Sequence, residues 1–245
     1  KYTLEQYRLS EYVDIETGGS GDPDSTFYRE DPDWEWRSGI TTTLSRRTTD
    51  RRFQPRIGSY SRLSADIFGG ALGGDVEFQR YVLEVRKYIP SFWRTTLMLR
   101  GRAGLVTGYG DPDTVPDDTR FELGGVGVNG IRGYDNRSIL PQGNELYGGR
   151  TMLIGTAELR IPITDEREQL PVYGVVFLDA GNTWESLVDE DDELATHPTD
   201  LYWGLGAGVR IEVPILGILG IDMGYGLDDE EGGDWVVHYQ FGLDF

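Results

Sequence analysis

The clearest feature of this sequence is a two-residue alternation of apolar and polar positions near its C-terminal end. Over 235–245 every odd position is apolar, from Trp235 to Phe245, while the even positions include His238 and Gln240. The same parity runs through 201–213 and 219–225, where glycine and charged residues oppose the apolar set. Because a period of two places successive side chains on opposite faces, each segment is predicted to be a β-strand with one apolar face.

Further segments with the same pattern lie upstream. The alternation is clear in 97–105 and 153–163, it is weaker in 2–15, 36–48, 59–69 and 76–88, and 172–184 is a mixed strand that contains Asp179. The total is about ten strands, each long enough to cross roughly 25 Å of hydrocarbon when tilted. No Pro-, Gly- or Ser-rich linker divides the chain into halves of different composition. The pattern therefore predicts one all-β, antiparallel domain.

Alternation alone does not decide which face lies inside, since a soluble barrel would bury its apolar face. Here the polar face is mostly glycine mixed with Arg, Glu and Asp, and the apolar face carries aromatic residues near the strand ends, as a lipid-facing wall does. The connections alternate between long and short, and the acidic runs 22–33, 111–118, 189–193 and 228–231 lie mainly in the long set. We therefore predict a transmembrane antiparallel β-barrel with charged stripes facing a watery lumen. A soluble β-sandwich or barrel with solvated acidic loops is the alternative.

Composition narrows the functional classes. The 245 residues include no cysteine, which excludes disulfides and thiolate metal sites, and the net charge of −19 argues against a sequence-independent nucleic-acid binder. The longest nearly unbroken apolar stretch, 213–221, is far shorter than the ~20 residues of a spanning helix. No cationic leader opens the chain, so a secretion signal is expected to be removed or to lie outside this sequence. The basic residues are almost all Arg, which together with the acidic surface fits either adaptation to high salt or genomic base composition.

The long segment 107–150 carries the most distinctive chemistry. Within it, 121–134 contains several glycines around a single arginine, Arg132, which allows the backbone to fold sharply and place the guanidinium in a confined space. A guanidinium can hold carboxylates with its rigid fork and stays charged at any relevant pH. Strand parity turns Glu158 and Asp179 toward the lumen, so these two acids are the candidate partners.

Three motifs in order along the chain closely resemble the BamA family of outer-membrane assembly factors. Ile131-Arg132-Gly133-Tyr134, preceded by Gly124-Gly125, is similar to the (V/I)RG(F/Y) motif in the family's sixth extracellular loop. The segment 177–184, FLDAGNTW, is similar to the FxDxGxxW strand that follows it. The segment 240–245, QFGLDF, resembles the family's terminal strand signal, which ends in an aromatic residue.

This resemblance implies an architecture and a role for the loop. By this resemblance, Arg132 is expected to bind Glu158 and Asp179 and so to lock the loop inside the barrel. A family barrel has sixteen strands and follows soluble periplasmic repeat domains. Residues 1–245 are therefore expected to be the C-terminal portion of one barrel domain, about its last ten strands, without the periplasmic repeats and the first barrel strands.

The resemblance also implies a function in the bacterial outer membrane. The protein would fold and insert other β-barrel proteins through a lateral seam, an openable junction between barrel strands, without catalytic residues, metal or other cofactors. Its implied partners are outer-membrane lipid, unfolded β-barrel clients and accessory lipoproteins of an assembly complex, and no nucleic acid. One side of the seam would be the C-terminal strand, with its signal residues Tyr239, Phe241, Gly242, Leu243 and Phe245.

Other functions remain as alternatives. A polypeptide transporter of the same superfamily, of the two-partner secretion type, would share the loop motif, and a passive outer-membrane pore would leave Arg132 unexplained. An enzyme is disfavoured, because His197 and His238 sit in no recognisable Ser/His/Asp arrangement. The acidic run 228–231 lacks the spacing and central glycine of a Ca²⁺ loop.

Overall fold

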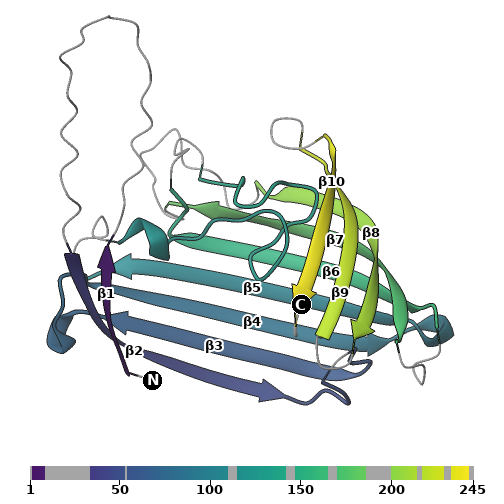
Figure 1. Ribbon diagram of the computed structural model, residues 1–245, viewed down its shortest axis with the longest axis horizontal. Coiled ribbons are helices and arrows are strands. Elements are labelled where there is room, and N and C mark those ends of the chain that lie inside the picture. The colour runs from purple at the N-terminus through teal and green to yellow at the C-terminus, as the bar shows by residue number, and fades with distance from the viewer. Residues whose placement is uncertain are drawn as a thin grey trace, which may run out of the picture.

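The computed structural model describes residues 2–8, 34–52, 54–109, 115–141, 147–164, 170–185, 200–213, 217–228 and 233–242. Within these ranges the chain forms one ten-stranded antiparallel sheet in which each strand pairs with the next along the chain (Figure 1). Short 3-10 helices lie in the connections. The strands are β1 (Tyr2–Arg8), β2 (Trp34–Arg47), β3 (Gly58–Phe68), β4 (Phe78–Pro90), β5 (Thr96–Gly108), β6 (Thr151–Pro162), β7 (Val172–Trp184), β8 (Tyr202–Val213), β9 (Gly217–Gly226) and β10 (Trp235–Gly242).

The observed strands confirm the all-β, antiparallel prediction of about ten strands. The expected strands 201–213 and 219–225 appear as β8 and β9 with ends shifted by no more than two residues. The expected strands 2–15 and 235–245 are seen as β1 and β10, and their remaining residues, 9–15 and 243–245, lie outside the described ranges. Strong alternation thus located the strands because the two faces of each meet different surroundings.

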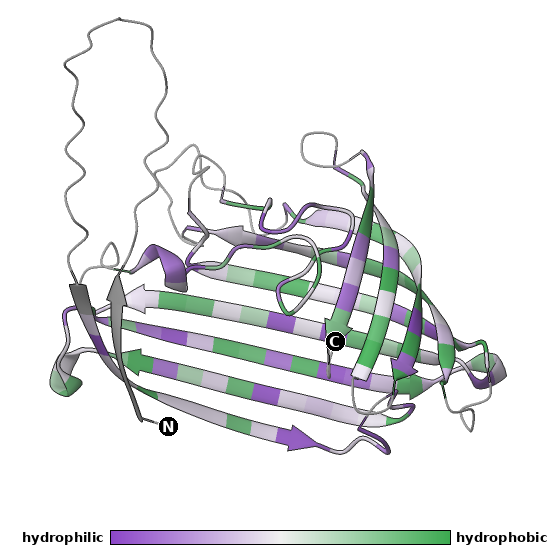
Figure 2. Cartoon of the chain, in the orientation of Figure 1, coloured by the Kyte–Doolittle hydropathy of each residue, from purple (hydrophilic) through white to green (hydrophobic). Residues whose placement is uncertain are grey.

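The sheet curves, and its apolar residues point to the outer, convex surface. Along the strands that Figure 2 colours, hydrophobic (green) and more polar (white or purple) positions alternate. Trp203 and Leu205 on β8 are 40% and 39% exposed, and Phe241 on β10 is 65% exposed. A soluble protein would bury such residues in its core and rarely exposes an apolar surface of this extent. The prediction that the apolar stripes lie on the outer surface is therefore confirmed.

The concave face is covered in part by the long β5–β6 connection, which folds inward as expected. Charged side chains occupy the middle of this face, but toward the end of the β5–β6 connection the inward positions are apolar. There Phe78, Val106 and Met152 pack with loop residues into a cluster of buried hydrophobic side chains. This part of the interior is apolar because the β5–β6 connection brings its own apolar residues with it.

The ten-stranded sheet has two edge strands, β1 and β10. Among the described residues β1 pairs only with β2 and β10 pairs only with β9, so no ladder joins the two ends of the sheet. The connections alternate as expected: the short turns 48–57 and 91–95 lie at one end of the sheet and the long β5–β6 connection at the other. Within the described part of the chain, no helix is long and apolar enough to span a bilayer.

Candidate functional site

The β5–β6 connection lies against the concave side of the sheet (Figure 1). We call its described residues, 115–141 and 147–150, the inward loop; it includes the 3-10 helix η4 (Asp117–Thr119). Phe121 and Gly149 exchange backbone hydrogen bonds of 2.8 and 2.9 Å, and Leu123 and Ile139 exchange bonds of 3.2 and 3.1 Å. Phe121, Leu123 and Ile139 are fully buried. The inward loop is therefore a packed, internally bonded element.

Glycine is required where the inward loop meets the strands. Gly133 has φ 102°, a region that side chains disfavour, and a Cβ there would lie 2.6 Å from the carbonyl carbon of Tyr225 on β9. On the facing strand β8, a Cβ at Gly204 would lie 1.9 Å from the carbonyl oxygen of Arg132. These glycines allow two backbones to touch, and this contact sets the position of Arg132.

Arg132 lies among the carboxylates that strand parity turned inward. Its Nε and Nη2 donate to Asp179 Oδ2 and Oδ1 at 2.7 and 3.0 Å, a two-pronged contact, and its backbone N–H donates to Asp179 Oδ2 at 3.1 Å. Its Nη1 donates to Glu158 Oε2 at 2.8 Å. All three side chains are more than nine-tenths buried. Bidentate, charge-assisted bonds of this kind hold a guanidinium in one orientation.

A third carboxylate, which the sequence analysis did not single out as a partner, completes the cluster. Asp222 on β9 is fully buried and accepts from Arg132 Nη1 at 3.3 Å, from Arg210 Nη2 at 2.5 Å and from Gln240 Nε2 at 2.7 Å. Its inward parity in 219–225 was visible in the sequence. What the sequence did not reveal is that the curvature of the sheet brings β9 to a residue 90 positions away.

The surroundings of Arg132 favour its charged form. The guanidinium carbon lies 3.6 Å from the ring centre of Phe177, so the ring covers the planar group. Burial alone would lower the pKa of Arg132, but Asp179, Glu158 and Asp222 together raise it above its ordinary value. The buried charge is thus compensated on several sides, as a desolvated ion needs to be.

The residues on either side of Arg132 are also held. Ile131 is fully buried in the apolar cluster. The backbone N–H of Gly133 donates to His238 Nε2 on β10 at 3.1 Å. The Tyr134 hydroxyl has two acceptors within reach of its single proton, the Asp228 carboxylate and the Trp203 carbonyl oxygen, the latter at 2.9 Å. Burial, and after it the hydrogen bond to Asp228, raises the pKa of Tyr134 above its ordinary value. Together with the bonds of Arg132, these contacts join the four-residue motif to every strand from β6 to β10.

A second polar cluster, which the sequence analysis did not identify, holds the tip of the inward loop. Glu84 on β4 is within 2.5 Å of Arg86 and 2.7 Å of Arg102, and its Oε1 lies 3.6 Å from Arg100 Nε. Arg100 donates to the Val128 carbonyl, and Arg102 Nε donates to Asn129 Oδ1 at 3.1 Å. The signal in the sequence that could have pointed to this cluster is that its residues occupy the inward-facing positions of their strands. The loop is thus held from β4–β5 on one side and from β6–β10 on the other.

The C-terminal strand signal is only partly described. Tyr239 and Phe241 point outward and are highly exposed, and Gly242 pairs with Ile218 of β9. Leu243 and Phe245 lie outside the described residues. The described part of β10 therefore presents an apolar outer face and an inner face that carries His238 and Gln240.

The Arg132 cluster is a network of paired charges. Glu158 and Asp179 accept hydrogen bonds from Arg132, and Asp222 accepts from Arg132, Arg210 and Gln240, so each carboxylate is already paired with a cation. Within the described ranges, no group of three or more His, Cys, Asp or Glu side chains is placed to hold a metal ion. The cluster holds the inward loop against β6, β7 and β9.

Comparisons with known proteins show what this chain is similar to. Three curated relatives are each named outer membrane protein assembly factor BamA. The protein of Neisseria meningitidis is 27% identical over 64% of this chain and 20% of its own length, that of Nitratidesulfovibrio vulgaris is 29% identical over 78% and 23%, and that of Neorickettsia risticii is 30% identical over 84% and 27%. The chain thus spans about a quarter or less of the length of these relatives.

A solved structure has the same fold. The crystal structure of BamA from Haemophilus ducreyi lacking POTRA domains 1–3 matches with a TM-score of 0.72 and 18% identity, over 98% of this chain and 50% of that one. The model of the Omp85 superfamily domain matches residues 1–245. With its lipid-facing apolar exterior, this chain is an outer-membrane β-barrel protein. By sequence and by fold, it belongs to the Omp85 superfamily.

Proposed function

We propose that this protein is an outer-membrane assembly factor that folds and inserts β-barrel proteins. Its likeness to relatives named as BamA assembly factors supports this function. The observation that carries the proposal is the hydrogen bond from Gly133 of the inward loop to His238, which joins the interior of the sheet to the C-terminal strand β10. Unpaired backbone groups in lipid cost several kcal/mol each, so a client strand is stabilised when it pairs with a strand of the barrel wall.

The proposed mechanism uses strand pairing and no covalent chemistry. An unfolded client strand has backbone N–H and C=O groups that lipid cannot satisfy, and β10 offers a template that can satisfy them. Tyr239, Phe241 and Gly242, together with Leu243 and Phe245, would form one side of this lateral seam. Residues 1–245 would then be the C-terminal portion of one barrel domain, consistent with a structural match that covers half of the longer chain. Accessory lipoproteins are proposed as further partners.

The inward loop would hold β10 in position while a client strand pairs with it. Arg132 ties the loop to β6, β7 and β9, and Gly133 ties it to β10. A loop anchored on these strands would hold β10 in its place in the sheet while a client strand pairs with it. We therefore assign Arg132, Glu158 and Asp179 the role of locking the loop.

A depletion experiment in the native host tests the proposal. Loss of the protein is expected to reduce many different β-barrel proteins in the outer membrane together, and the wild-type gene should restore them. Complementation with Arg132→Ala is expected to restore them poorly, whereas Arg137→Ala, on the exposed part of the same loop, should restore them fully. An outer membrane with its normal β-barrel content after depletion would disprove the assignment.

A polypeptide transporter is the second candidate, and a passive pore the third. Both need a continuous open lumen, whereas here Phe121, Leu123 and Ile139 of the inward loop pack into a buried apolar cluster on the concave face. This packing favours assembly over conduction. In the depletion experiment, loss of a single secreted polypeptide with unchanged outer-membrane proteins would identify a transporter.

A further inference from the structure

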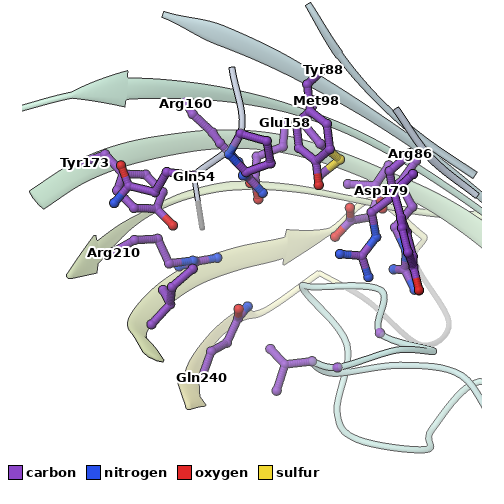
Figure 3. A pocket seen from close by; sticks show the side chains of 18 of the residues that line it. Gln54, Arg86, Tyr88, Met98, Glu158, Arg160, Tyr173, Asp179, Arg210 and Gln240 are labelled. Carbon is purple, nitrogen blue, oxygen red and sulfur yellow. The ribbon is translucent and has the colours of Figure 1, made fainter. Parts of the chain in front are cut away.

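Charged side chains are arranged differently on the two faces of the sheet. On the inner face they come from several strands and line an interior pocket, among them Arg86, Glu158 and Arg160 (Figure 3). These charges are paired: Arg160 Nε donates to Glu158 Oε1 at 2.9 Å, and Arg86 Nε donates to Glu84 Oε1 at 2.5 Å. The outer face carries two basic residues, and neither is paired in this way.

Arg46 on β2 and Lys87 on β4 are the only charged residues at the described outward-facing positions of β2–β10. Arg46 pairs across the ladder with Ser61, and Ser61 pairs with Val85, which is 42% exposed on the outer face. Lys87 is two residues beyond Val85 and so faces the same side. Both basic residues are exposed, and neither side chain has a hydrogen bond or ion pair within the described part of the chain.

Both residues lie near the end of the sheet that has the short turns. Lys87 is three residues from Pro90, the last residue of β4, which is roughly 10 Å along the strand. Arg46 is next to the last residue of β2. In outer-membrane barrels the short turns face the periplasm, and long basic side chains extend along an apolar wall to keep their charge at the interface. The two cations therefore lie at the level of the periplasmic headgroups.

The β4–β5 turn places aromatic side chains at the same end of the sheet. Phe92 and Trp93 are 60% and 88% exposed, and their rings meet edge to face with centres 5.6 Å apart. Trp93 and Arg94 have positive φ angles of 49° and 68°, which are uncommon for residues other than glycine and often accompany a function. Exposed tryptophan is typical of the membrane–water interface. The turn thus marks the interface a few residues from Lys87.

An apolar groove lies on the outer face further along the same strands. Its volume is about 360 Å³, and its lining is almost entirely apolar, within the range of roughly 300–1,000 Å³ that is common for ligand sites. Ala103 on β5 forms its floor and pairs with Leu83 on one side and Leu153 on the other. These two leucines are 47% and 46% exposed. A small residue between two large ones on adjacent strands leaves this hollow.

The groove and the two cations are connected along the strands. Leu83 is four residues from Lys87, roughly 14 Å along β4, which is close to the half-thickness of a bilayer's hydrocarbon core, about 15 Å. Between them Val85 pairs with Gly101, and a Cβ at Gly101 would meet nothing within 4 Å. An extended acyl chain can therefore run from the cations to the groove over an open part of the wall.

We propose that this surface binds one glycerophospholipid of the periplasmic leaflet through an anionic headgroup and one acyl chain. The headgroup would lie between Arg46 and Lys87, and the chain would lie in the groove over Ala103. Charges on a lipid-facing wall are costly unless they are paired, and the headgroup supplies the counter-charge. A lipid suits the surface better than a protein, because the groove opens into the hydrocarbon layer. This inference is independent of the proposed assembly function.

Spin-labelled lipids test the site in the intact protein, reconstituted into phosphatidylcholine bilayers at fixed salt. The spectra separate lipids held by the protein from bulk lipids, and so compare phosphatidylglycerol with phosphatidylcholine of identical chains. We expect a preference of at least about fivefold for phosphatidylglycerol at one site, from the attraction of basic residues for an anionic headgroup. Equal affinity for the two lipids would overturn the proposal.

Charge variants test whether the preference arises at this surface. Lys87→Gln and Arg46→Gln are each expected to lower it by about fivefold. Arg62→Gln makes the same charge change on β3, but Arg62 pairs in register with Glu84 on the inner face, so this variant should keep the wild-type preference. An equal loss in Arg62→Gln would overturn the location of the site.

A second pair of variants tests the groove without changing the charge. Ala103→Leu fills its floor and should weaken phosphatidylglycerol binding, whereas Ala207→Leu, at an exposed position on the outer face of β8 outside the groove, should not. A photoreactive side chain in place of Val85 is expected to couple to phospholipid. Unchanged binding in Ala103→Leu, or coupling to a polypeptide in place of lipid, would overturn the proposal.

Discussion

The backbone N–H of Gly133 donates a hydrogen bond to His238 Nε2, 105 positions later in the chain. This bond joins the inward loop directly to the edge strand β10, at the residue next to the buried Arg132. Because the ring nitrogen must accept this bond, His238 has its Nε2 unprotonated in this arrangement. The Arg132 cluster inside the sheet and the C-terminal strand β10 are therefore one connected structure.

Removing the acceptor from His238 should loosen this connection. In His238→Phe the buried N–H of Gly133 loses its partner, at a cost of about 1–3 kcal/mol. Hydrogen exchange should become faster at Gly133 and along β10, while β4 and β5 stay unchanged. His238→Gln offers an amide oxygen and should recover part of the protection. Wild-type exchange at Gly133 in His238→Phe would refute the coupling.

Arg132→Ala should release the inward loop without destroying the sheet. It leaves Glu158, Asp179 and Asp222 with less positive charge in a buried site, and we expect a loss of about 3–5 kcal/mol in the free energy of unfolding if the site is dry. Arg132→Lys should be intermediate, since an ammonium group cannot make the two-pronged contact. Denaturant unfolding and limited proteolysis of the loop measure the effect.

Arg137→Ala is the matched control for that experiment. Arg137 is on the same loop, its side chain is 75% exposed, and it pairs with Glu122. An exposed ion pair contributes at most about 1 kcal/mol. An equal loss in the free energy of unfolding in Arg132→Ala and Arg137→Ala would contradict the locking role proposed for Arg132.

Gly133→Ala should be more harmful than Gly127→Ala. Both glycines have a positive φ, 102° and 101°, so both substitutions introduce similar backbone strain. A Cβ at Gly133 meets the backbone of Tyr225 at 2.6 Å, whereas a Cβ at Gly127 meets nothing within 4 Å. The difference between the melting temperatures of the two variants measures the effect of the close approach between Gly133 and β9. Identical melting temperatures would show that the loop does not contact β9.

Glu84→Gln should free the tip of the inward loop. The substitution removes the carboxylate that forms ion pairs with Arg100 and Arg102, whose donors hold Val128 and Asn129. A spin label at the exposed Val128 is expected to become more mobile. Glu122→Gln, which affects an exposed pair on the same loop, should leave its mobility unchanged. Unchanged mobility in Glu84→Gln would exclude Glu84 from the positioning of the tip.

An arginine introduced on the outer face of the sheet should lower the free energy of unfolding more than one introduced on the inner face. Leu205→Arg places a charge in the lipid-facing wall, where about 2–4 kcal/mol is lost near the bilayer centre. Thr43→Arg places the same side chain on the exposed concave face of β2 and should have little effect. Unfolding from lipid bilayers compares them, and equal stability would refute the assignment of the faces.

The sequence located most strands because each strand separates lipid from the interior, and that difference imposes a period of two. The same parity turned Glu158 and Asp179 inward, and the glycine context singled out Arg132. Asp222 and Glu84 have the same parity but no distinguishing motif, so they looked like ordinary inward residues. Their contacts depend on how far the sheet curves, which no local pattern records.

The sequence by itself determined the antiparallel meander and the orientation of its faces, because both follow from local alternation and from the lengths of the connections. Only the tertiary structure decided which residues fill the interior beside the expected inward loop: the loop packs with inward positions of β4, β5 and β6 into a buried apolar cluster at one end. It also decided that Arg132, Asp222 and His238 belong to one connected site. The physical reason is that these contacts join residues about ninety or more positions apart, and the curvature of the whole sheet brings them together.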